Sequence, residues 1–168
     1  MTQRPGAFAT TAPGRTISPS LGQWAGIQLV RNTMRASTEL RNIIEGWFES
    51  VAKGDLSWAE RHISRRAGVR LVGTDPAEWL EGPQVAEFLK EEVKALGNVV
   101  QVSCRDTEAY QEDSVGWGLS TPILTLPNGK QIAPRWSAVF HQEDGEWKLV
   151  QLHASVGVAN EALLGMEG

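Results

Sequence analysis

Cysteine is almost absent from this chain, since Cys104 is the only one among 168 residues. A single cysteine excludes an intrachain disulfide and any metal site built from several thiolates, and it suits a reducing compartment. The three histidines are scattered and lack the spacing of a zinc site or a facial triad. No glycine-rich loop precedes a helix in a way that would hold phosphate. We therefore expect no metal, no cofactor and a cytoplasmic protein.

Positive charge is also scarce, because the chain has 16 Lys and Arg but 20 Asp and Glu, which gives a net charge of −4. Binding to nucleic acid generally needs a basic surface. No apolar run approaches the roughly 18 residues that cross a bilayer. The composition therefore predicts a soluble protein with neither a nucleic acid nor a membrane as partner.

The N-terminal region differs from the rest, since residues 1–33 carry three Arg and no acidic residue and leave −7 for the remainder. This stretch is rich in Pro, Gly, Ser and Thr, which favours disorder. We expect residues 1–36 to be a disordered or non-native tail, with a translation start at Met34 or an organellar address as alternatives. Residues 161–168 are predicted to be a C-terminal tail.

Helical periodicity marks the first half of the remaining chain. Ser37 or Thr38 can cap a helix whose apolar stripe ends at Gly54. A short helix is predicted from Asp55 to Ile63, and a third begins at Pro83. Between them, Val69–Gly73 is predicted as a short strand, and the segment Asp75–Glu78 has the pattern of a capping box at a helix start.

The period changes from 3.6 to 2 after residue 98. Four long strands are predicted, with hairpin turns at Asn128-Gly129 and Asp144-Gly145; they span Val99–Tyr110, Val115–Leu126, Ile132–His141 and Trp147–Val158. Because helices precede an antiparallel meander, the predicted class is α+β.

Alternation assigns the two faces of this sheet. One face is apolar and should pack on the helices: Trp136, Ala138, Phe140, Val150, Leu152 and Ala154. The opposite face is largely polar and should meet water or a partner: Arg135, Leu149, Gln151, His153 and Ser155. We expect Arg135, Gln151, His153 and Ser155 to form an interface. A nucleophilic role for the His153–Ser155 pair is the alternative.

Seven tryptophans against one tyrosine and four phenylalanines suggest a wide aromatic interior. A sheet bent around helices could enclose a cavity that binds a small hydrophobic molecule. The alternative is that these side chains fill a solid core. The predicted lining comprises Trp47, Trp117, Trp136, Phe140, Val150, Leu152 and Tyr110.

Three carboxylates are candidates for a general base. Asp75 and Glu78 lie at the predicted helix start, where ordinary capping is the alternative. Asp106 shares a strand face with Tyr110 and could approach the cavity rim, with a solvated strand end as the alternative.

The segments 135–140 and 144–155 resemble the last hairpin of the SnoaL-like and nuclear transport factor 2-like superfamily. Trp47-Phe48 and the segment from Gly73 to Trp79 fit too, and the resemblance covers residues 37–160. It implies a cone-like α+β barrel: three N-terminal helices packed in the concave face of a strongly curved, mainly antiparallel sheet. It also implies a homodimer joined through the outer sheet face.

The ketosteroid isomerase relatives place their general base on the short strand after the second helix, at the position of Gly73. Their oxyanion hole pairs a tyrosine with a protonated acid, whereas Tyr110 lies on a strand. Association domains of calmodulin-dependent kinases carry pocket arginines where this chain has Ala138 and Ala154. The resemblance leaves three functions open: a binder of a small hydrophobic or aromatic molecule, a cofactor-free isomerase, cyclase or dehydratase, and a non-catalytic oligomerisation module.

Overall fold

The computed structural model describes residues 33–165, so most of the predicted N-terminal tail lies outside the described residues. Within this range no helix combines the length and the apolar character that a membrane span requires. The four helices are α1 (Thr38–Lys53), α2 (Ser57–His62), α3 (Pro83–Leu96) and α4 (Asn160–Leu164). Ser37 caps α1 by accepting a hydrogen bond from the backbone N–H of Leu40 at 3.4 Å. Gly54 ends the same helix with φ of 67°.

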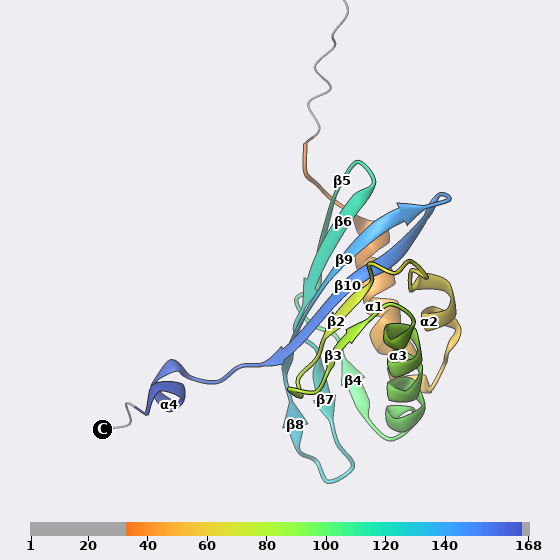
Figure 1. The fold of residues 1–168 in the computed structure, drawn as a ribbon. Helices are drawn as coiled ribbons and strands as arrows, with labels where there is room; N and C mark the ends of the chain where they lie inside the picture. Colours follow the sequence, from red (N-terminus) through yellow and green to blue (C-terminus); the bar gives the residue numbers. More distant parts are fainter. Residues whose placement is uncertain (1–32, 166–168) are drawn as a thin grey trace, which may run out of the picture. The chain divides into compact units, whose positions relative to one another are not determined.

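The strands form a seven-stranded sheet and a three-stranded sheet (Figure 1). The order of the large sheet is β1 (Arg35–Ala36), β5 (Glu108–Glu112), β6 (Val115–Ser120), β9 (Pro134–Glu143), β10 (Glu146–Val156), β2 (Arg70–Val72) and β3 (Trp79–Glu81). The small sheet contains β4 (Gln101–Ser103), β7 (Ile123–Thr125) and β8 (Gln131–Ile132). Only the β10–β2 pair is parallel among the strand pairs of residues 33–165. The predicted α+β class and the curved, mainly antiparallel sheet are confirmed.

Three predicted long strands are each divided between the two sheets, and in one of them Ile132 belongs to β8 while the segment 134–141 belongs to β9. The segment 99–110 contains β4 and β5, and the connection between them includes Asp106 with φ of 51°. The segment 115–126 is interrupted between β6 and β7, where Pro122 lies. A proline cannot donate a ladder hydrogen bond, so it favours a change of sheet at this point.

A β-bulge in β10 corrects the predicted face assignment. The register with β9 shifts between Leu149 and Gln151, so Val150 is the extra residue. Leu149 consequently faces inward, pairs with Phe140 and is fully buried, although alternation had placed it outside. Val150, predicted to line the interior, is only half-buried.

Two glycines of β6 let α1 pack directly on the sheet. A Cβ atom at Gly116 would overlap the side chain of Leu40, and one at Gly118 would overlap that of Ile44. Gly116 and Gly118 therefore face the core, and Trp117 between them points to the outer face. The prediction that Trp117 lines the interior is wrong.

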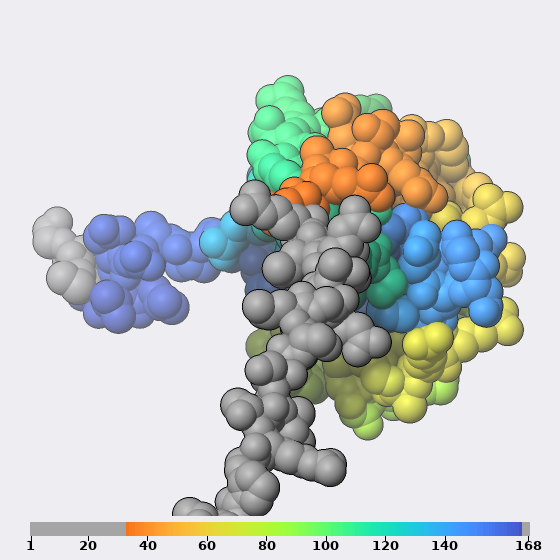
Figure 2. All heavy atoms as spheres, turned by 90° about the horizontal axis from the view of Figure 1, so that it is seen from above, coloured from red at the N-terminus to blue at the C-terminus, as the bar shows by residue number. Residues whose placement is uncertain are grey.

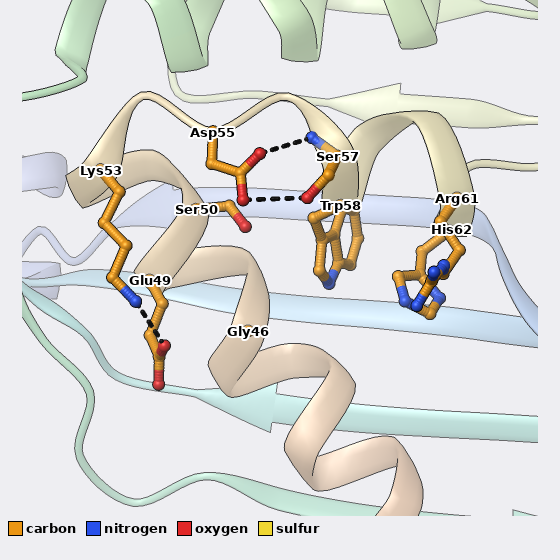
Figure 3. Close-up of a pocket in the computed structure, with 9 residues that line it drawn as sticks. All are labelled: Gly46, Glu49, Ser50, Lys53, Asp55, Ser57, Trp58, Arg61 and His62. Carbon is orange, nitrogen blue, oxygen red and sulfur yellow. Dashed lines mark hydrogen bonds and ion pairs between the residues drawn. The ribbon is translucent and has the colours of Figure 1, made fainter.

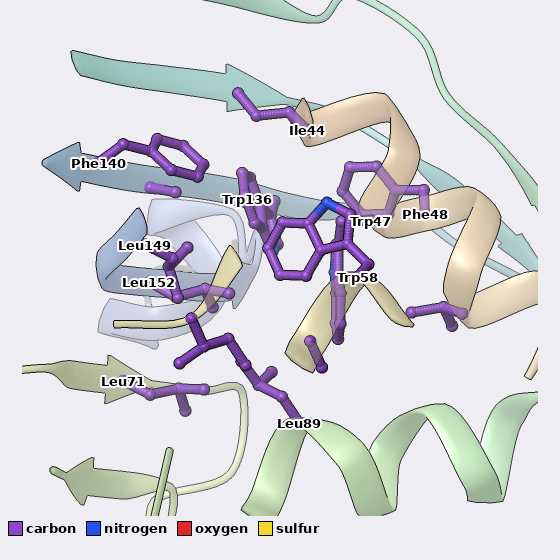
Figure 4. Close-up of a cluster of buried hydrophobic side chains, with 14 of the residues drawn as sticks. Ile44, Trp47, Phe48, Trp58, Leu71, Leu89, Trp136, Phe140, Leu149 and Leu152 are labelled. Atoms are coloured by element: carbon purple, nitrogen blue, oxygen red, sulfur yellow. The ribbon is translucent and has the colours of Figure 1, made fainter. Parts of the chain in front are cut away.

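Five buried aromatic side chains fill the space between α1, α2 and the sheet (Figure 4): Trp47, Phe48, Trp58, Trp136 and Phe140. Trp47, Trp136 and Phe140 are all buried. Phe48 meets Trp136 edge to face with ring centroids 5.5 Å apart, and Trp47 lies 5.0 Å from Trp58. In this part of the interior the rings pack on one another, as in a solid core.

Candidate functional site

A polar hollow of about 280 Å³ lies between the end of α1 and α2 (Figure 3). Three of its charged or titratable side chains, Lys53, Asp55 and His62, already have partners within the chain. Lys53 pairs with Glu49 at 3.0 Å, and Asp55 accepts hydrogen bonds from the backbone N–H and the hydroxyl of Ser57, both at 2.9 Å. Burial lowers the pKa of His62, whose Nδ1 lies 3.2 Å from the carbonyl of Trp147. These interactions stabilise the connection between α1 and α2.

A larger groove of about 520 Å³ separates α1 from β4 and reaches Cys104. The thiol lies 3.0 Å from the Thr107 hydroxyl and 3.2 Å from the Ser120 hydroxyl, and these two hydroxyls are 3.0 Å apart. The three side chains satisfy one another where the chain passes between the two sheets. The groove is lined by Phe48, Ala52 and Val102 together with charged side chains of α1.

The residues predicted to line one cavity lie in two different places. Trp47, Trp136, Phe140 and Leu152 are inward and belong to the buried core. Tyr110 and Trp117 stack on the outer face, with ring centroids 6.3 Å apart. The Tyr110 hydroxyl donates to Glu108 at 3.1 Å, and this bond raises the pKa of Tyr110.

Asp75 and Glu78 belong to the turn that joins β2 and β3, and no helix begins there, in contrast to the prediction. One of the two bonds of a capping box is nevertheless present, and the Asp75 side chain caps the turn two residues on instead of three. Asp75 accepts from the backbone N–H of Ala77 at 2.8 Å, and Glu78 Oε2 accepts from the backbone N–H of Asp75 at 3.1 Å. The sequence pattern therefore stabilises a hairpin turn instead of a helix.

This turn places the Glu78 carboxylate over Gly73. The backbone N–H of Gly73 donates to the carbonyl of Glu78 at 2.9 Å, so the two residues lie opposite each other across the hairpin. A Cβ atom at position 73 would overlap Glu78 Oε2 and would lie 2.8 Å from Glu78 Cβ. The carboxylate of Glu78 thus occupies the side-chain position of residue 73.

Alternation shows which way Glu78 points. Leu71 is buried and pairs with Leu80 across β2 and β3, so both side chains face inward. Gly73 and Glu78 each lie two residues from this pair and share its face. Glu78 is therefore half-buried on the inner side of the hairpin, toward α3.

Glu92 of α3 is the second carboxylate at this place. Burial, and then the nearby charge of Glu78, raise the pKa of the Glu92 carboxyl to about 7. Glu92 is one turn after Phe88 and one turn before Leu96, two half-buried residues that pack against the core. A carboxyl group with this pKa exchanges its proton near neutral pH.

Two small residues of the sheet, Ala154 and Gly73, lie next to Glu78 on the inner face. Trp136 pairs with Ala154, and the parallel register pairs His153 with Val72, so its continuation by one residue sets Ala154 beside Gly73. The row across the inner face therefore runs from the indole of Trp136 over Ala154 and Gly73 to the carboxylate of Glu78. The Glu78 carboxylate lies at the end of this row, and its charge reaches Glu92 of α3.

The other predicted site residues lie elsewhere. Asp106 is exposed in the connection between β4 and β5, where it accepts from the Thr121 hydroxyl at 3.5 Å. Asp106 is therefore not part of the site that contains Glu78. Alternation in β9 and β10 places four side chains on the outer face, as predicted: Arg135, Gln151, His153 and Ser155. No group of three His, Cys, Asp or Glu side chains within residues 33–165 could hold a metal ion.

Glu92 was not predicted from the sequence, because a charged residue on an amphipathic helix is normally solvated. The spacing of Phe88, Glu92 and Leu96 is the signal that could have revealed it. Residues at i, i+4 and i+8 share one face, and two of these three are apolar.

The comparisons with known proteins agree with this fold. The chain matches the SnoaL-like domain family over residues 40–159. No curated protein matches the sequence.

Solved structures with a similar fold have low sequence identity. A nuclear transport factor 2-like protein of unknown function from Pseudomonas putida KT2440 is 12% identical, with a TM-score of 0.63 over 76% of this chain and 94% of that one. The association domain of CaMKII from C. elegans is 14% identical, with a TM-score of 0.57 over 70% and 92%.

A protein from Shewanella frigidimarina that is proposed to be a ketosteroid isomerase is 12% identical, with a TM-score of 0.57 over 68% and 92%. At these identities the likeness concerns the fold alone. Because the family match spans most of the chain, this protein belongs to the SnoaL-like domain family.

Proposed function

We propose that the domain binds a small, largely apolar molecule beside the inner face of the β2–β3 hairpin and transfers a proton on it. The observation that carries this proposal is the position of the Glu78 carboxylate over Gly73. The resemblance to the ketosteroid isomerases implies a general base at position 73, and here a carboxylate reaches the same place from the following turn.

Glu92 supplies the complementary group. Burial and the nearby charge of Glu78 both disfavour ionisation of Glu92, so a substantial fraction of the Glu92 carboxyl groups hold their proton at neutral pH. The protonated Glu92 can donate to a carbonyl oxygen of the substrate, while the Glu78 carboxylate removes a proton from the adjacent carbon and returns it to another carbon. This scheme describes a cofactor-free isomerisation of a cyclic ketone.

Apolar side chains on α3 and on the sheet favour an apolar ligand at this site. Phe88 and Leu96 flank Glu92 on α3, while Ala154 lies on the sheet side. Apolar walls with a few placed polar groups are the usual composition of small-molecule sites. They also maintain the burial that raises the pKa of Glu92.

The test is a thermal-shift screen with cyclic ketones such as steroid enones and quinones. For a compound that stabilises the protein, Glu78→Gln should abolish hydrogen–deuterium exchange at the carbon beside the carbonyl, followed by NMR. Glu92→Gln should weaken binding or slow the exchange at least tenfold. The control Glu87→Gln changes an exposed carboxylate of the same helix and should have no effect.

A different result would place the ligand in the groove between α1 and β4. In that case Ala52→Trp, which fills the groove, would abolish the stabilisation, and the Glu78 and Glu92 variants would bind normally. That outcome contradicts the proposed site.

We also propose that the domain forms a homodimer through the outer face of the large sheet. The observation that favours this second function is the apolar surface around Trp117. Leu119 is 50% exposed, Val115 is exposed, and Tyr110 stacks on Trp117. A hollow of about 130 Å³ lies on this face and is lined in part by Trp117, Leu119 and Val139. Contiguous exposed apolar residues on a sheet are typical of protein contacts.

Sedimentation velocity tests the dimer. Leu119→Glu should shift the protein to a monomer, because it places a charge in the centre of the contact. Val99→Glu makes the same change at an equally exposed position away from this face and should leave the dimer intact. A wild-type protein that sediments as a monomer at high concentration would contradict the proposal.

A further inference from the structure

The chain continues beyond β10 as an arm, defined as residues 157–165, in which every residue is exposed. The arm contains α4, which has no buried residue. Figures 1 and 2 show that it projects away from the sheet and the other helices.

The arm is unusually apolar for a segment in water. Val158 is 61% exposed, Leu163 is 72% exposed and Leu164 is 67% exposed, and Val156 at the end of β10 is exposed as well. Single exposed apolar residues are common, but four within nine positions form a surface that gains stability when it is covered.

We infer that this arm packs against a second copy of the chain, with Leu163 and Leu164 on the partner's outer sheet face. The inference rests on the proposed homodimer. The strand that leads into the arm contributes Gln151 to the lining of the hollow around Trp117. If the outer sheet faces of two copies meet about a two-fold axis, the arm of one copy extends over the outer face of the other. The symmetry then repeats this contact with the two copies exchanged.

Charge complementarity supports the same partner. Arg135 lies on the outer face next to the start of the arm, with its guanidinium carbon 4.0 Å from the position of a Cβ at Gly157. Glu161 is the acidic residue in the first turn of α4. Neither residue belongs to an ion pair within residues 33–165. In a two-fold arrangement Arg135 of each copy can pair with Glu161 of the other.

Disulfide trapping between two differently tagged full-length chains tests the inference. Both chains carry Cys104→Ser, so that no native thiol interferes. One chain also carries Arg135→Cys and the other Glu161→Cys. Oxidation of the mixture should give a covalent heterodimer, whereas Lys130→Cys, at an exposed turn, should give none with Glu161→Cys.

A chain with both Arg135→Cys and Glu161→Cys separates the alternatives. If the arm folds back on its own domain, this chain closes an internal disulfide and remains monomeric after denaturation, which overturns the inference. Leu163→Glu with Leu164→Glu should weaken dimerisation at least tenfold in sedimentation. A dimer that is lost with Leu119→Glu but unchanged with these arm variants supports the sheet contact and overturns the arm contact. A monomeric wild type overturns both.

Discussion

The carboxylate of Glu78 occupies the space that a side chain at Gly73 would need. Glycine is therefore required at position 73 for packing, and not for an unusual backbone conformation. The Glu78 carboxylate is fixed there by the backbone N–H of Asp75 at 3.1 Å. A hairpin turn thus supplies the carboxylate that the strand itself lacks.

Substitution of Gly73 by alanine should displace Glu78 and break its bond to the Asp75 backbone. We expect a loss of about 1–3 kcal/mol in the free energy of unfolding, as for overpacked sites, measured by urea denaturation. Gly68→Ala is the control, because a Cβ at Gly68 meets no atom within 4 Å. Equal stability of the two variants would show that the turn adapts without cost.

The raised pKa of Glu92 predicts a pH-dependent stability. The folded protein holds the proton up to a pKa of about 7, whereas the unfolded chain releases it near 4.5, so stability falls as the pH rises between these values. From about pH 5.5 to about pH 8 the loss should be about 2 kcal/mol.

Urea denaturation at both pH values measures this loss, and Glu92→Gln should remove most of it. Glu87→Gln changes an exposed carboxylate on the same helix and should retain it. A wild-type protein whose stability is the same at both pH values would disagree with a buried, protonated Glu92.

The direct contact between α1 and β6 predicts a cost for any side chain at position 118. A Cβ there would overlap Ile44 and would lie 2.7 Å from the carbonyl oxygen of Glu108, which belongs to the backbone and cannot move aside easily. Gly118→Ala should therefore lower the free energy of unfolding by about 2 kcal/mol or more. A melting temperature equal to that of wild type would contradict the close packing.

Periodicity was sufficient to predict α1, α2 and α3 and one face of the sheet, but not α4, which lies mostly in the predicted C-terminal tail. The apolar stripe of α1 and the alternation of Trp136, Ala138 and Phe140 are both confirmed, because each depends on local spacing alone. The inward position of Leu149 required knowledge of a bulge, and two adjacent apolar residues, Leu149 and Val150, do not show which of them is the extra one.

The candidate site was predicted only in part. Glu78 was identified as a candidate base, but its position over Gly73 depends on a turn whose sequence also fits a helix start. Glu92 was missed because its burial and the nearby charge of Glu78 depend on tertiary structure. Trp117 was placed inside because aromatic residues are usually buried, whereas the glycines on either side of it face α1.

The proposed acid–base pair, Glu78 and Glu92, is tested most directly by an NMR titration of the side-chain carboxyl carbons of glutamate. In the wild-type protein Glu92 should titrate near pH 7, with the resonance assigned by its loss in Glu92→Gln. In Glu78→Gln the midpoint of Glu92 should fall, because the like charge is gone, and should stay above 4.5, because burial remains. A midpoint near 4.5 in the wild-type protein, unchanged in Glu78→Gln, would contradict the pairing of Glu78 with Glu92.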